Sequence, residues 1–131
     1  MLTSALVLLP LTALTIRVFG LNATRALLTG KLPMKPHPTQ PSREEVIGVV
    51  RLVRIARRYH SRWTNCLTHS LVLWLMLRRR GVAAEIRIGT QYDSAHRFSA
   101  HAWVEWEGLI LNDSQDVGIR YAPFQRPVIV A

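Results

Sequence analysis

The hydrophobic pattern of this chain changes its period once, near Gly81, and that change limits the folds open to it. Before Gly81, apolar residues recur every three or four positions, as on one face of a helix. After it they alternate with polar residues, as in strands with one buried face. Helices followed by strands favour an α+β domain. With 131 residues the chain has room for one such domain.

Two helices are predicted before the change of period. The first runs from about 43 to 60, and Ser42 and Glu45 form a capping box at its start. Its polar side carries Arg51, Arg54, Arg57 and Arg58. Such a row is most simply a solvated face, and alternatively a docking face for an acidic chain. The second helix starts at about residue 65 and runs to Arg80, where a glycine follows.

Three strands are predicted after the change of period. Alternation of apolar and polar residues indicates strands over 84–89 and 101–106. A third strand, Leu109 to Leu111, follows a turn that contains Gly108. We expect these strands to form a small antiparallel sheet packed on the second helix.

The N-terminal part is strongly apolar. Residues 2–29 are interpreted as two helical pieces, but the apolar run 2–16 is shorter than the about 20 residues of a spanning helix. We expect these pieces to pack against the fold, with contact to a membrane surface or a partner protein as the alternatives. Four prolines in 31–41 predict an extended connector. The segment 1–41 would then precede a core of residues 42–131 within one structural domain.

The net charge and the cysteine content indicate the kind of partner surface and the cellular compartment. Lys and Arg number 17 against 8 Asp and Glu, and the net charge of +9 favours an acidic partner surface. The single cysteine excludes an internal disulfide and a multi-cysteine zinc site, and it favours a reducing compartment. We expect a cytoplasmic protein, with membrane association through the N-terminal segment as the alternative.

Cys66 lies in the first turn of the second predicted helix, directly after Asn65. The free backbone N–H groups and the positive end of the helix dipole stabilise a thiolate there, and they could hold an oxyanion. Taken alone, Cys66 is more simply a buried structural residue. His101 and Asp113 follow in the predicted strands, however, and the three residues supply a nucleophile, a base and an orienting group in that order.

This set of residues requires a particular hairpin. If the turn is the three-residue loop 106–108, Glu105 pairs with Leu109 and His101 stands directly opposite Asp113. A two-residue turn would shift the register by one and place the two side chains on opposite faces of the sheet. We therefore expect the three-residue turn.

The same region resembles the transglutaminase-like B2 proteins of lasso-peptide biosynthesis, over about residues 62–125. The most specific features are the order of Cys66, His101 and Asp113 and the block His-Ala-Trp-Val-Glu at 101–105. The segments that carry the resemblance are 65–73, 78–81, 86–89, 98–105 and 111–113.

The resemblance implies a cysteine peptidase that removes the leader from a ribosomally made precursor peptide through an acyl-enzyme. It implies Cys66 as nucleophile, His101 as base and acid, and Asp113 as the orienting group. The implied partners are the precursor, a leader-recognition protein termed B1, and an ATP-dependent cyclase that closes a ring on the freed α-amine. Because residues 1–60 show no winged-helix pattern, we expect the split form, which needs B1 in trans.

Two other functions use the same residues. One is an acyl or amine transferase on the same triad, and the other is a non-catalytic scaffold that binds precursor or cyclase through its basic helix. His69, one turn after Cys66, is a second candidate base, or a zinc ligand together with Cys66 and His101. We nevertheless expect no cofactor and no metal.

The other histidines and the aromatic residues have simpler interpretations. The histidines expected to be exposed are His37, His60 and His96, and the aromatics expected in the core or a pocket wall are Phe98, Trp103, Tyr121 and Phe124. Basic charge with such aromatics does not indicate nucleic-acid binding.

Overall fold

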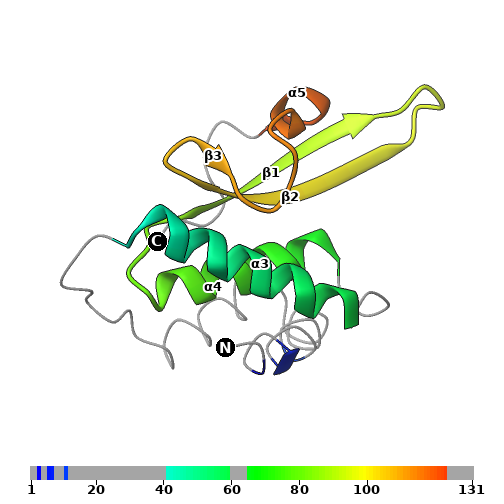
Figure 1. Cartoon of the computed structure of the whole chain (residues 1–131). Coiled ribbons are helices and arrows are strands. Elements are labelled where there is room, and N and C mark those ends of the chain that lie inside the picture. Colours follow the sequence, from blue (N-terminus) through cyan, green and yellow to red (C-terminus); the bar gives the residue numbers. More distant parts are fainter. Residues whose placement is uncertain (1–2, 4–5, 8–10, 12–40, 60–64, 124–131) are drawn as a thin grey trace.

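Two helices precede a curled sheet in the computed structural model, which describes residues 3, 6, 7, 11, 41–59 and 65–123 (Figure 1). The elements are α3 (Arg43–Tyr59), α4 (Cys66–Arg78), β1 (Glu85–Tyr92), β2 (Phe98–Trp106), β3 (Leu109–Ile110), α5 (Val117–Arg120) and β4 (Ala122–Pro123). The four strands form one antiparallel sheet of order β3-β2-β1-β4. The α+β prediction is confirmed.

The N-terminal predictions fall largely outside the described residues. Most of the two helical pieces in 2–29 and of the connector 31–41 lies outside the described residues, and the division at residue 41 stays a prediction. Leu6 is helical and packs against the hydrophobic core. Within the described ranges, none of the helices combines the length and the apolar character needed to cross a bilayer.

Helix α3 confirms the predicted amphipathic helix. The Glu45 carboxylate accepts from the Ser42 N–H at 2.9 Å, and the Ser42 hydroxyl accepts from the Glu45 N–H at 3.2 Å, as the capping box requires. Its buried face consists of Val46, Val49, Val50, Val53 and Ala56. The arginines of α3 are exposed, and Arg54 and Arg57 lie next to the buried face, one turn after Val50 and Val53.

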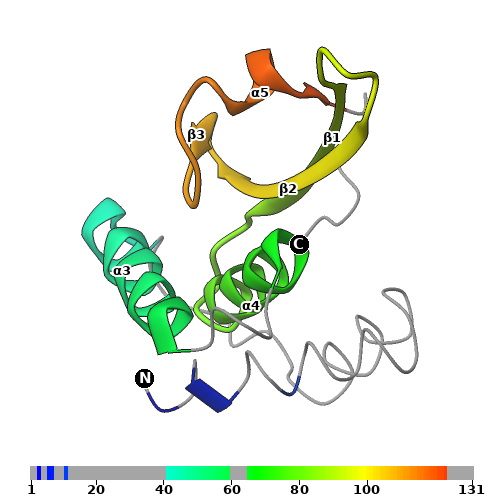
Figure 2. The ribbon, with the colours of Figure 1, turned by 90° about the vertical axis from the view of Figure 1, so that its right-hand side faces the viewer.

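Helix α4 is the centre of the core, because every residue from Thr68 to Leu77 is buried. It packs against α3 on one side and beneath the sheet on another (Figure 2). Asn65 caps its start by accepting from the Thr68 N–H at 2.9 Å. The helix ends at Arg78 and not at the predicted Arg80, and Gly81 follows with a φ of 75°.

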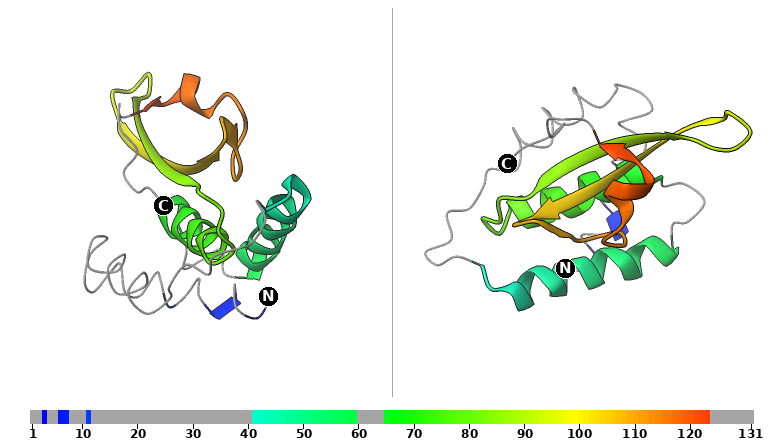
Figure 3. Two further views of the ribbon diagram at one scale, coloured as in Figure 1. Left: turned by 90° about the vertical axis from the view of Figure 1, so that its left-hand side faces the viewer. Right: turned by 90° about the horizontal axis from the view of Figure 1, so that it is seen from above.

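The sheet turns one apolar face towards α4. Ile86 pairs with Val104 in the β1–β2 ladder, and both are buried against the helix together with Ala102. Figure 3 shows the sheet lying against α4 and curling away from the helix towards α5. β2 begins at Phe98, so His101 lies within the strand and not at its start. Phe98 was expected in the core or a pocket wall, but it is exposed and contacts Tyr92 at the end of the ladder.

The β2–β3 turn differs from the predicted one. Trp106 pairs with Leu109 and Glu105 with Ile110, so the loop has two residues and not three. Glu107 and Gly108 both have positive φ, 49° and 78°. This is the geometry of a type I′ turn, whose twist matches that of the flanking strands. The prediction of a three-residue turn was wrong because only glycine was expected to take the left-handed conformation.

Substitution by alanine should have opposite effects on stability at two glycines that have open space around them. An added Cβ would meet no atom within 4 Å at either Gly48 or Gly108, but Gly48 is helical and Gly108 has a φ of 78°. We expect Gly48→Ala to raise the free energy of unfolding by about 0.5–1 kcal/mol and Gly108→Ala to lower it by about 1 kcal/mol. Urea denaturation of both variants measures the difference. Equal effects at the two positions would contradict the turn geometry.

Candidate active site

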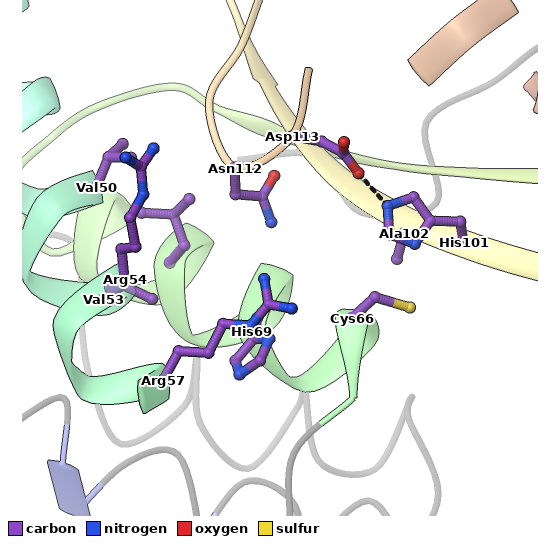
Figure 4. A pocket seen from close by; sticks show the side chains of 11 residues that line it. Val50, Val53, Arg54, Arg57, Cys66, His69, His101, Ala102, Asn112 and Asp113 are labelled. Carbon is purple, nitrogen blue, oxygen red and sulfur yellow. Dashed lines mark hydrogen bonds and ion pairs between the residues drawn. The ribbon is translucent and has the colours of Figure 1, made fainter. Parts of the chain in front are cut away.

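A cavity of about 250 Å³ opens between α3, the start of α4 and the chain that follows β3 (Figure 4). Its walls are formed by Val50, Val53, Arg54, Arg57, Cys66, His69, Leu73, His101, Ala102, Asn112 and Asp113. All three residues of the predicted triad therefore line one cavity, although Cys66 and Asp113 lie 47 positions apart in the sequence.

Cys66 is the first residue of α4 and is partly exposed in this cavity. Asn65 takes the Thr68 N–H, whereas the N–H groups of Cys66 and Leu67 have no acceptor within the helix. These two donors lie next to the thiol. They are suited to stabilise negative charge on the sulfur or on an oxygen bound close to it.

His101 and Asp113 form a hydrogen bond between Nε2 and Oδ2. An ionised carboxylate only accepts, so the imidazole proton lies on Nε2 and Nδ1 is left as the acceptor. Figure 4 shows Cys66 on the side of the ring away from Asp113. The carboxylate thus selects the tautomer that a base for Cys66 requires.

The pKa of Asp113 is lowered from its ordinary value of 3.8. Burial opposes this shift, but the hydrogen bonds from His101 and from the Ser114 N–H, together with the Arg120 charge, outweigh it. Ser114 N lies 2.7 Å and Arg120 Nη2 3.2 Å from Oδ1. Asp113 therefore stays ionised at neutral pH, with one oxygen for His101 and the other held by its own loop and α5.

Two aromatic rings flank the His101 imidazole. The centroid distance is 5.1 Å to Tyr121 and 6.2 Å to Trp103. Gly89, the ladder partner of His101, makes room for them, because a Cβ there would lie 2.8 Å from atoms of both side chains. Trp103 is fully buried, as expected from the sequence, and Tyr121 is half-buried beside the imidazole.

The two-residue turn does not separate His101 from Asp113, because the β2–β3 ladder ends early. Leu111 N–H still donates to the Val104 carbonyl at 2.9 Å. Val104 N–H then donates to the Asn112 side chain, at 2.8 Å from Oδ1, where a continued ladder would offer a main-chain carbonyl. The chain is therefore free to bend at Asn112 and to bring Asp113 to His101.

The same Asn112 amide ties this bend to α4. Its Nδ2 donates to Ser70 Oγ at 3.0 Å, and the Ser70 hydroxyl donates to the Ala102 carbonyl at 3.1 Å. Ser70 is fully buried and lies one turn beyond Cys66 on the same helix. The helix that carries the thiol, the strand that carries the imidazole and the loop that carries the carboxylate meet at this network.

His69 also lines the cavity, but it is not suited to be the base. It is buried, and its pKa is lowered from 6.5 to about 4, first by desolvation and then by the charge of Arg57. It is therefore neutral at neutral pH. Across the described ranges, no group of three His, Cys, Asp or Glu side chains could hold a metal ion, so nothing there supports the zinc alternative.

Several residues of this site were missed in the sequence analysis. Ser70 and Asn112 position the loop, and Arg120 holds Asp113. Arg54 and Arg57, which were interpreted most simply as part of a solvated face, line the cavity. The spacing of four residues from Cys66 could have indicated Ser70, since such residues share a helix face. No comparable signal identifies the others.

A comparison with protein families agrees with this geometry. The profile of the transglutaminase-like superfamily matches residues 6–126, which is nearly the whole chain. The chain therefore belongs to the transglutaminase-like superfamily, which includes cysteine proteases and transferases. Searches of curated proteins and of solved structures gave no significant match.

If Asn112 positions Asp113, its loss should reach the chemistry of Cys66. Asn112→Ala should lower the rate of Cys66 alkylation about three- to tenfold at pH 6–7, because His101 loses a fixed carboxylate partner. It should move the pH profile in the same direction as Asp113→Asn. Gln115→Ala is the matched control, since the Gln115 side chain bonds the main chain of Ile110 at the edge of the hairpin. Equal profiles for both variants would contradict the positioning role.

Buried His69 predicts an acid-sensitive stability. Because its folded pKa of about 4 lies below the unfolded 6.5, the unfolded chain binds more protons between these values. The contribution of neutral His69 to the free energy of unfolding is therefore fully present above pH 6.5. It is lost as the pH drops towards 4, by up to about 3 kcal/mol. His69→Gln should remove this loss in denaturant titrations, whereas His96→Asn, at an exposed loop position, should retain it. Parallel curves for wild type and His69→Gln would refute the assignment.

Proposed function

We propose that this chain is a cysteine peptidase that removes the leader from a ribosomally made lasso-peptide precursor. The observation that carries the proposal is the His101–Asp113 hydrogen bond at the wall of the cavity that Cys66 lines. Membership of the transglutaminase-like superfamily supports a thiol-dependent acyl transfer. The sequence resemblance to the B2 proteins supports the precursor as substrate.

In the proposed reaction Cys66 passes its proton to His101 Nδ1, and the sulfur attacks the carbonyl carbon of the scissile bond. The N–H groups at the start of α4 stabilise the oxyanion. His101 then protonates the leaving nitrogen, which becomes the α-amine of the core peptide, while the leader stays on Cys66 as a thioester. His101 deprotonates a water that hydrolyses the thioester, and the leader carboxylate and the free thiol result. Asp113 holds the imidazole throughout and does not itself take the proton.

This function requires other components. The proposed partners are the precursor peptide, a separate leader-recognition protein that presents it, and an ATP-dependent cyclase that uses the freed amine. We place the reaction in the cytoplasm, where precursor synthesis and ATP are available. No metal or cofactor enters any step of the proposed mechanism.

Because Cys66 is the only thiol, its alkylation reports one site. We expect the iodoacetamide rate to persist down to about pH 6, well below the ordinary thiol ionisation near pH 8.5. His101→Ala should restore the ordinary profile. With the precursor and its recognition protein present, Cys66→Ala should abolish cleavage and Asp113→Asn should slow it about 10²–10⁴-fold.

Two outcomes would change the proposal. If Cys66→Ala still processes the precursor, the chain is a scaffold and its thiol is inert. If an added primary amine ends up on the leader carboxyl group, as judged by product mass, the chain is a transferase on the same triad. Circular dichroism of each variant separates loss of chemistry from loss of fold.

A further inference from the structure

The cavity at Cys66 continues along α3. A second cavity of about 220 Å³ lies between α3 and the β2–β3 hairpin, and it shares Val50 and Arg54 with the first. Its walls are formed by Arg43, Val46, Ile47, Val50, Arg54, Trp106, Leu109, Ile110, Leu111 and Gln115. Figures 2 and 3 show α3 running along the side of the sheet where β3 forms the edge. We call the two cavities together the α3 groove.

The α3 groove carries unbalanced positive charge. Arg54 and Arg57 are exposed, and neither has an ion-pair partner among the described residues. Arg57 reaches into the middle of the cavity in Figure 4, between α3 and Cys66. Its charge also acts on the buried His69, which agrees with this position. Asp113 also lines this cavity, but its carboxylate is held by His101 and Arg120, so no described carboxylate pairs with Arg54 or Arg57.

Apolar side chains line both ends of the α3 groove. Val50, Val53 and Leu73 line the end near Cys66. Ile47 and the half-buried Leu109 and Ile110 line the other end, and Ile47 is exposed. Apolar walls with arginines along one side match a chain that presents both apolar and acidic side chains. A groove that ends at a thiol favours a peptide over a nucleic acid.

We propose that the substrate peptide lies extended in the α3 groove, with acidic side chains paired to Arg54 and Arg57 and apolar side chains against the walls. This inference rests on the proposed function and names its substrate class, a segment rich in acidic and apolar residues next to the scissile bond. From Arg43 to Arg57, α3 is about 21 Å long at about 1.5 Å per residue. An extended peptide covers this length with about six residues at about 3.3 Å each.

Protection of Cys66 tests the α3 groove with defined probes. Two six-residue peptides, acetylated and amidated, alternate Leu with Glu in one case and Leu with Gln in the other. We expect the Glu peptide to halve the iodoacetamide rate of the full chain at about one tenth of the concentration that the Gln peptide needs. Arg54→Glu with Arg57→Glu should abolish this preference, and Arg57→Gln alone should reduce it.

The matched control changes the same charge elsewhere on α3. Arg51→Glu with Arg58→Glu alters two exposed arginines that line neither cavity, so the preference should persist. Equal protection by the two peptides, or loss of the preference in both double variants, would overturn the proposal. Protection by oligothymidylate as strong as that by the Glu peptide would assign the charge to nucleic acid instead.

Different results would contradict the α3 groove proposal and the peptidase proposal. Protection needs only an accessible thiol, so the Glu preference can be measured whether or not Cys66 is catalytic. If the preference is absent while His101→Ala still changes the alkylation profile, the peptidase survives and the substrate class is wrong. If the preference is present while His101→Ala has no effect, the chain binds acidic peptides without the proposed chemistry.

Discussion

One side-chain amide determines the geometry of the candidate site. Asn112 accepts the Val104 N–H in place of a main-chain carbonyl and donates to Ser70, which is buried in α4. The ladder can therefore end without leaving a buried donor unpaired, which would cost about 1–3 kcal/mol. The bend that follows brings Asp113 to His101. Helix, strand and loop each carry one proposed catalytic residue, and this network is where they are joined.

The burial of α4 keeps this hydrogen-bond network rigid. Every residue from Thr68 to Leu77 is buried, with α3 packed on one side and the sheet on another. A helix surrounded in this way has little freedom to shift. Cys66 at its first turn is consequently held in place by the core, while it remains partly exposed to the cavity. The same arrangement desolvates His69, which stays neutral beside a row of arginines.

The arginines around the candidate site differ in whether an acidic residue pairs with them. Within the described residues the α3 arginines are left without ion pairs, whereas Arg120 is held by Asp113 and Asp116. One arginine thus supports the carboxylate of the proposed triad, and two others line the path by which a peptide would reach the thiol. An arginine that lies near an acidic residue has a structural role, whereas the arginines without such a partner remain available for a substrate.

The sequence by itself determined the order of helices and strands, the capped starts of α3 and α4, and the candidate residues Cys66, His101 and Asp113. These follow from local periodicity and from end-capping chemistry, which act over a few residues. The tertiary structure alone decided how His101 meets Asp113. The local turn is of the type expected to separate them, and a contact between Asn112 and Ser70, 42 residues apart, overrides it. Such a contact depends on how distant elements pack, and no pattern within either segment encodes it.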